Sequence, residues 1–326
     1  QYKEINMEMK KISEIKKGDR VEEFFVIKSV DVKVSNNSNT NKYFDFNLGD
    51  ASGDINAKLW EYNEELENKF KQSILVKIKG TVNEWRGKLQ LKIEAIRLTE
   101  EKDNVNICDY VAVAPYLPEK MYDDILNYLS KIENTDIQNI VTNILSYNEE
   151  KLMHYPAAKS NHHAIRSGLL YHTTTMLKAG EKLSEIYTFL NTDLLYAGII
   201  LHDIGKIYEM NASELGIVSE YSVEGQLLGH IVQGVKMIET ASIEVKADKE
   251  VTMLLEHMVL AHHYEAEYGS PKKPMIPEAE MLHHLDIMDA RMYDMNKALG
   301  DTKKGKFSER IRSLDNISIY NSFFNK

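Results

Sequence analysis

Histidine is the residue type best suited to chemistry in this sequence, and its distribution is uneven. All 11 histidines follow residue 150. A single histidine beside apolar residues on a helix is more often structural. Several of them with nearby carboxylates indicate a divalent-metal site, because neutral imidazole and carboxylate groups bind such ions well. The histidines in this setting are His172, His202 (followed by Asp203), His230, His262 and His263.

The most informative local unit is His202-Asp203-Ile204-Gly205-Lys206. Adjacent side chains on a helix diverge by about 100°, given about 3.6 residues per turn. His202 and Asp203 can therefore reach one metal ion only from a helix end or a distortion, with the carboxylate free to bridge to a second ion. Gly205 allows a bend of the chain or the close approach of another element.

The order of these residues resembles the two-metal pattern of the HD superfamily of metal-dependent phosphohydrolases. The full set is His172, His202, Asp203, His230, His262, His263 and Asp286. The resemblance implies one ion held by His172, His202, Asp203 and Asp286. Asp203 then bridges to a second ion held by His230 and by His262 or His263. Asp289 competes as the last ligand, but an Asp followed four positions on by a small residue, here Ala290, favours Asp286.

A closer resemblance is to the YhaM family of 3′-to-5′ exoribonucleases, which join an OB fold to an HD domain. It rests on residues 157–163, 168–173, 224–231, 262–271 and 285–290. It implies hydrolysis of single-stranded RNA, with DNA left open, to nucleoside 5′-monophosphates by attack of a hydroxide shared by two ions. Manganese is the foremost candidate, and cobalt, iron or nickel also suit the ligands. Tyr171 departs from the family, whose members commonly carry an acid there.

Within this mechanism, Asp203 is the shared catalytic carboxylate, and Lys206 is expected to neutralise charge that develops on the phosphoryl group. Arg166 is a weaker candidate for the same role, and Lys206 could instead be a solvated lysine at a helix end. We expect His162 and His163 to line the substrate path and the remaining histidines to be structural. Two rival functions stay open: a cyclic-dinucleotide phosphodiesterase or nucleotidase, and a non-catalytic RNA-binding protein with a vestigial HD core.

The elements that must position these groups change character along the chain. Apolar residues recur at three- and four-residue spacing over residues 121–301, which predicts an all-α helical domain. Residues 101–120, with Pro115 and Pro118, are predicted to form a linker. The basic tail, residues 302–326, either docks on the helical domain or stays mobile.

Residues 1–100 show short stretches of alternating polarity, which predict an all-β domain. Five strands with a short helix at 63–70 between the third and fourth give the order of an OB-fold barrel. The polar stretch at 35–41 is expected to be a loop. Candidate nucleic-acid contacts are Trp60, Trp85, Arg86 and Lys88 here, and Lys272 and Lys273 at the catalytic mouth, with Tyr43, Phe44, Phe46, Lys58 and Tyr62 as further candidates. Because strands alternate, about half of the aromatic side chains must face the barrel core.

Composition narrows the class of protein. The formal net charge of -10 argues against a protein that merely coats nucleic acid. Residues 10–98, however, carry 17 Lys and Arg against 14 Asp and Glu, a balance of +3 that suits a binding module. Cys108 is the single cysteine, so a reducing cytoplasm is the expected location. No secretory leader is visible at Gln1, and no apolar stretch is long enough to span a membrane, so we expect no membrane association. Whether the protein forms a homo-oligomer is left open by the sequence.

Overall fold

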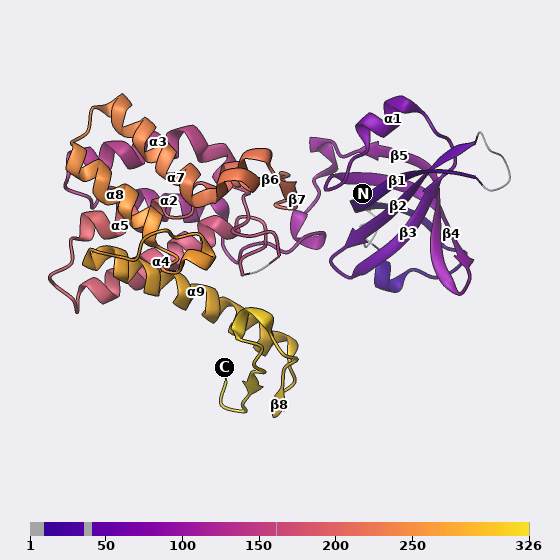
Figure 1. Cartoon of the computed structure of the whole chain (residues 1–326). Helices are drawn as coiled ribbons and strands as arrows, with labels where there is room; N and C mark the ends of the chain where they lie inside the picture. The colour runs from indigo at the N-terminus through magenta and orange to yellow at the C-terminus, as the bar shows by residue number, and fades with distance from the viewer. Residues whose placement is uncertain (1–9, 36–40, 161, 326) are drawn as a thin grey trace, which may run out of the picture. The chain divides into compact units, whose positions relative to one another are not determined.

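The computed structural model describes residues 10–35, 41–160 and 162–325. The chain divides into two compact units, one up to Ala112 and one from Val113 onward (Figure 1). This division falls inside the stretch predicted as a linker. The first nine residues of the predicted β domain, and positions 36–40 of its predicted loop, lie outside the described residues.

The first unit is a closed five-stranded barrel, in the order β1-β2-β3-β5-β4. Its elements are β1 (Arg20–Val34), β2 (Lys42–Asp50), β3 (Gly53–Leu59), α1 (Glu64–Lys69), β4 (Leu75–Trp85) and β5 (Lys88–Leu98). The 15-residue β1 pairs antiparallel with both β2 and β4, and a short parallel pairing of β3 with β5 closes the barrel. The predicted strand order and short helix are confirmed.

Alternation along β2 decides which side chains fill the barrel. Phe44, Phe46 and Leu48 are fully buried, whereas Tyr43 and Asp45 between and before them point outward and are only partly buried. Phe44 and Phe46 were among the candidate stacking faces for nucleic-acid bases, and their burial excludes both, as expected for about half of these aromatic side chains. Successive side chains of a strand point to opposite sides, so these two rings belong to the core.

The second unit is a bundle of helices. They are α2 (Pro118–Leu129), α3 (Thr135–Leu152), α4 (Gly168–Ser184), α5 (Thr192–Leu201), α6 (Lys206–Glu209), α7 (Val223–Val245), α8 (Lys249–Ala261) and α9 (Pro277–Asp301), with a small hairpin of β6 (Met210–Ala212) and β7 (Val218–Tyr221). Asn134, Asn191, Ser222 and Asp248 cap the starts of α3, α5, α7 and α8 with their side chains. In the described part of the chain, no helix is both long and apolar enough to cross a membrane.

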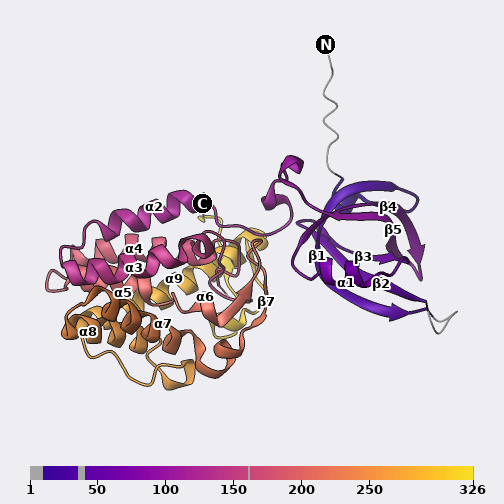
Figure 2. The same ribbon diagram turned by 90° about the horizontal axis from the view of Figure 1, so that it is seen from above.

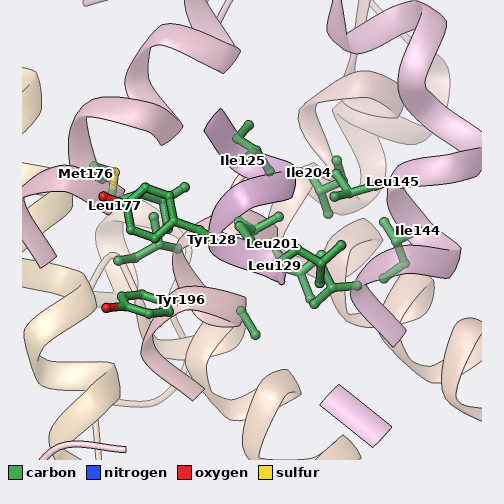
Figure 3. Close-up of a cluster of buried hydrophobic side chains, with 14 of the residues drawn as sticks. Ile125, Tyr128, Leu129, Ile144, Leu145, Met176, Leu177, Tyr196, Leu201 and Ile204 are labelled. Atoms are coloured by element: carbon green, nitrogen blue, oxygen red, sulfur yellow. The ribbon is translucent and has the colours of Figure 1, made fainter. Parts of the chain in front are cut away.

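Helix α5 lies among the helices α3, α4, α8 and α9 (Figure 2) and contacts all four of them. Every residue from Leu194 to Leu201 is buried, as expected of a helix that is apolar on all sides. Figure 3 shows Leu201 among side chains of the neighbouring helices, including Tyr128 and Leu129. This packing holds the C-terminal end of α5, where His202 and Asp203 follow, rigidly inside the bundle.

The C-terminal segment packs against the end of α9. It contains β8 (Lys306–Phe307), a 3₁₀ turn η5 (Arg312–Leu314) and β9 (Tyr320–Asn321), and β8 pairs with β9. Leu314 is fully buried, and the Asn321 amide donates to the carbonyls of Leu299 and Thr302. Of the two alternatives for the tail, the described residues therefore show the docked one.

Candidate metal centre

Five helices or helix ends bring the seven candidate ligands together. His172 lies on α4, His202 and Asp203 directly after α5, His230 on α7, His262 and His263 directly after α8, and Asp286 on α9. The side chains of His172, His202 and His262 are fully buried, and Asp203 is nearly so. Polar groups gathered in this way in a helical core need partners or a bound ion.

One group of donor atoms surrounds the Nε2 atom of His172. This nitrogen lies 3.2 Å from His202 Nε2 and 3.2 Å from Asp286 Oδ1. His202 Nδ1 donates to the carbonyl of Ile199 at 2.8 Å, so its Nε2 carries a lone pair. His172 Nδ1 similarly faces Asp289 Oδ2 at 2.7 Å. Two ring nitrogens and carboxylate oxygens directed at one point fit a divalent cation.

A proton and a metal ion compete for His172. Burial lowers its pKa, but hydrogen bonds with Asp286 and Asp289 outweigh burial and raise the pKa of His172 to about 10. Metal binding at Nε2 therefore has to release a proton.

A second group of donor atoms faces the other oxygen of the same aspartate. Asp203 Oδ1 lies 3.5 Å from His230 Nε2 and 3.9 Å from His262 Nε2. The His263 ring lies 4.1 Å from that of His262 and 5.2 Å from that of His230, centroid to centroid. The Nδ1 atoms of His262 and His263 bond to the carbonyls of Val259 and Tyr268, which leaves both Nε2 atoms for an ion.

Unpartnered atoms in this second group test whether a metal ion fits. Among the described residues, Asp203 Oδ1, His230 Nε2 and His262 Nε2 are buried without a hydrogen-bond partner. Buried polar atoms in native proteins rarely lack one. Burial, and then the neighbouring imidazoles His263 and His202, lower the pKa of His262 and keep it neutral, the form that binds metals. The residues present therefore fit a pair of divalent ions that share Asp203.

Asp203 owes its position to a helix end, as its sequence predicts. Helix α5 ends at Leu201, and a tight turn carries the chain into α6 at Lys206. A Cβ atom on Gly205 would stand 2.0 Å from the carbonyl oxygen of His230 and 2.8 Å from the backbone nitrogen of Gly234. The predicted close approach is thus that of α7, and it brings His230 to Asp203.

Asp289 and His163 form a chain of hydrogen bonds behind His172. Asp289 Oδ2 accepts from His172 Nδ1 at 2.7 Å and contacts His163 Nε2 at 2.8 Å. Burial opposes ionisation of Asp289, but these two histidines hold its pKa at about 2. Asp286 faces the Nε2 side of His172 and Asp289 the Nδ1 side. The spacing of three residues on α9 signalled that both lie on one face. His163, expected along the substrate path, is buried instead.

Glu209 accepts a hydrogen bond from Nδ1 of His230, as Asp289 does from His172. This role was not predicted from the sequence. Glu209 Oε1 accepts from His230 Nδ1 at 3.1 Å and from the His230 backbone N–H at 3.0 Å. That N–H is free of the helix because Gly229 interrupts α7 with φ 70° and ψ 167°. The signal in the sequence was the glycine directly before a ligand histidine.

Lys206 and Arg166, the two basic side chains predicted to act in catalysis, differ in their position relative to the metal centre. Lys206 Nζ lies 2.7 Å from Asp203 Oδ2 and its side chain is only 12% exposed, so it is not a solvated lysine. Although burial opposes it, the positive charge of Lys206, followed by the contact with the His202 ring, holds the pKa of Asp203 well below its ordinary value. Arg166 donates from Nε to the carbonyl of Glu214, and no hydrogen bond or ion pair among the described residues joins it to the cluster.

Lys272 and Lys273 lie in the loop between α8 and α9. The loop is tied to the centre at Ser270, whose Oγ accepts from the backbone N–H of His263 at 3.0 Å. Lys273 Nζ lies 4.5 Å from the centre of the Tyr264 ring and 3.9 Å from Glu265. Both lysines are exposed, so they place positive charge on the surface of the loop that follows His263.

The barrel's aromatic and basic candidates lie on or next to β2, β3 and the turn between β4 and β5. Trp60 is 50% exposed, its ring lies 4.7 Å from that of Tyr43, and Lys58 Nζ lies over both rings. Trp85, 63% exposed, lines a surface pocket of about 400 Å³. Other residues lining this pocket include Asn56, Arg86, Lys88 and Gln90. Asn56 of β3 pairs with Gln90 of β5, so the group around Trp60 and the pocket around Trp85 belong to one outward face. We call it the barrel face.

Comparisons with known proteins agree with both units. The family model described as "HD domain" matches residues 169–291, and the model described as "OB-fold nucleic acid binding domain" matches residues 28–99. The N-terminal barrel is therefore an OB fold, and the helical domain that follows is an HD domain.

Solved structures with similarity to this chain include replication proteins. The second OB-fold domain of replication protein A from Methanococcus maripaludis is 19% identical, and the match covers 28% of this chain and 93% of that one, with a TM-score of 0.23. A replication factor A related protein from Methanobacterium thermoautotrophicum is 16% identical, with 29% and 94% covered and a TM-score of 0.24. A replication protein A heterotrimer bound to single-stranded DNA is 13% identical, with 28% and 66% covered and a TM-score of 0.22.

Proposed function

Since the chain joins an OB-fold nucleic-acid-binding domain to an HD domain of the metal-dependent phosphohydrolase type, we propose that it is a 3′-to-5′ exoribonuclease. It would hydrolyse single-stranded RNA to nucleoside 5′-monophosphates. The observation that carries the proposal is the pair of donor groups that share Asp203, in one chain with an exposed aromatic and basic barrel face. A hydrolase of small nucleotides needs the donor groups but has no evident use for the barrel face.

His172, His202, Asp203 and Asp286 would hold one ion, and Asp203, His230, His262 and His263 the other. When bound, such ions stabilise negative charge on phosphate oxygens and lower the pKa of water towards neutrality. Histidine and carboxylate ligands suit manganese, and also cobalt, iron or nickel.

The chain's own residues prepare the centre for this chemistry. Asp289 and Glu209 accept from the Nδ1 atoms of His172 and His230, which turns each Nε2 towards Asp203. Lys206 keeps a positive charge beside Asp203 in a site that excludes most water. There it would stabilise the negative charge that develops on the phosphoryl group, and a buried site strengthens such an interaction.

The barrel face suits an unpaired strand. Tyr43, Trp60 and Trp85 offer ring faces on which bases of any sequence can stack, with Lys58 and Arg86 at hand for phosphates. Duplex RNA does not expose its base faces, so this chemistry favours single strands.

The direct test follows the products of a 5′-labelled RNA oligomer with manganese present. We expect a ladder that shortens from the 3′ end, together with free nucleoside 5′-monophosphates. A DNA oligomer of the same sequence and a cyclic dinucleotide run in parallel. Turnover of the cyclic dinucleotide with an intact RNA oligomer would contradict the proposal, and so would binding of the oligomer without any cleavage.

A further inference from the structure

A large pocket lies between α9 and the C-terminal segment. Figure 1 shows where this segment folds back beside the end of α9. Its volume is about 1110 Å³. The residues that matter here are Tyr268, Ala290, Arg291, Lys297, Arg312 and Asp315. Three of these, Lys297, Arg312 and Asp315, lie beyond residues 169–291, the part of the chain that matches the HD domain.

The pocket borders the metal centre. Ile287 and Ala290 line it from α9, and they stand one and four residues after the candidate ligand Asp286. Tyr268 also lines the pocket, and its carbonyl accepts from Nδ1 of His263 at 2.6 Å. Between Asp286 and Asp301, at about 1.5 Å per residue, α9 extends the pocket's wall for about 20 Å.

The C-terminal segment is held as a wall of this pocket by specific contacts. Asp315 pairs with Arg291 at 3.0 Å, and Ser313 Oγ donates to Asp294 at 2.5 Å. Leu314 between them is fully buried. These contacts leave the neighbouring residue Arg312 exposed to the pocket.

Some charged side chains on the pocket wall have hydrogen-bond or ion-pair partners, and others have none among the described residues. Arg291, Asp294 and Asp315 are engaged with one another or with Ser313. Lys297 and Arg312 have no hydrogen-bond or ion-pair partner among the residues that the structure describes, and Asp301 is the remaining acid on the lining. Tyr268, 71% exposed, adds an aromatic face.

We propose that this pocket binds the 3′-terminal nucleotides of the single-stranded substrate, with phosphates at Lys297 and Arg312 and a base on Tyr268. An aromatic face with two free cations is the combination that binds unpaired nucleotides without regard to sequence. The inference rests on the proposed function. It makes the C-terminal segment a part of the substrate site.

The test uses the full-length double variant Lys297→Gln/Arg312→Gln. Binding of a fluorescein-labelled RNA oligomer is followed by anisotropy in EDTA, so that affinity is measured apart from cleavage. We expect Kd to rise about tenfold, and the slope of log Kd against log salt to fall by about 1.4, since each phosphate contact on a single strand contributes about 0.7. Manganese-dependent hydrolysis of bis(p-nitrophenyl) phosphate, which is too small to span the pocket, should not change.

The matched control is Lys303→Gln/Lys306→Gln, which removes two exposed lysines of the same segment that do not line the pocket. Equal Kd and salt slope in both double variants would overturn the inference, and so would a matching loss on the small diester, because the residues would then support the centre instead. If the wild-type protein binds but does not cleave RNA while the pocket variant alone binds weakly, the exoribonuclease proposal fails and the pocket stands.

Discussion

Asp203 concentrates the chemistry of this chain in one side chain. Its two oxygens face different groups of imidazoles, with His202 Nε2 3.3 Å from Oδ2 and His230 Nε2 3.5 Å from Oδ1. Lys206 offsets its charge from a third direction. A neutral amide cannot replace this arrangement, because it offers one oxygen and adds two N–H donors.

We therefore expect Asp203→Asn to lose both ions and to lower kcat for the RNA oligomer on the order of 10³-fold, which is about 4 kcal/mol of barrier. Elemental analysis of the purified variant gives the metal content, and single-turnover cleavage gives the rate. Asp123→Asn, an exposed aspartate on α2, is the control. An Asp203→Asn protein that retains two ions and wild-type cleavage would remove this residue from the centre.

Asp289 acts through His172. Its carboxylate can only accept, so it keeps the proton of His172 on Nδ1, whereas the amide in Asp289→Asn can donate and favour the other tautomer. We expect manganese affinity to fall about 10- to 100-fold, with the fold intact by circular dichroism. Titration calorimetry with manganese measures the affinity. Glu280→Gln on the same helix, where the Glu280 side chain contacts the exposed His284, should bind manganese like the wild type.

At the scale of elements, the centre depends on the close contact of α7 with the turn between α5 and α6. Gly205 makes this contact possible because its missing side chain leaves room for the backbone at His230 and Gly234. Backbone atoms cannot move aside as a flexible side chain can, so α7 as a whole would have to shift.

Gly205→Ala should consequently destabilise the protein by about 1–3 kcal/mol and weaken metal binding as well, since α7 carries His230. Urea unfolding followed by circular dichroism measures the first effect. Gly300→Ala is the matched control on α9, where a Cβ would have nothing within 4 Å. That control should be neutral or stabilising by up to about 1 kcal/mol. Equal stability of the two variants would contradict the role given to the contact.

At the scale of the whole molecule, two compact units carry separate tasks in the proposed function. The barrel face carries the rings and cations, and the helical domain carries the donor groups. A change confined to the barrel should alter the affinity for a long RNA strand without altering the chemistry at the metal centre.

We expect the double variant Trp60→Ala/Trp85→Ala to weaken RNA binding by about 30-fold or more, since each of two stacked bases contributes about 1–3 kcal/mol. Hydrolysis of bis(p-nitrophenyl) phosphate should stay at the wild-type rate. Anisotropy and absorbance assays measure the two effects, and Trp60→Phe/Trp85→Phe should keep most of the affinity. If the alanine variant binds RNA with wild-type affinity, the barrel face is not the RNA-binding site.

Much of this protein follows from its sequence alone. Alternation over residues 18–98 predicts the barrel, three- and four-residue spacing predicts the helical domain, and His202-Asp203 predicts a helix end at the centre. These features are local: the period of apolar residues and the chemistry of neighbouring side chains act over a few positions, so they can be read along the chain.

Only the tertiary structure decided the pairings between distant residues. It placed Asp286 and Asp289 on opposite nitrogens of His172, joined Glu209 to His230, and buried Phe44 and Phe46 while leaving Trp60 outside. It also docked the C-terminal segment on α9. Such outcomes depend on how whole helices and strands pack, and the same local pattern is compatible with many packings, so no short stretch of sequence contains them.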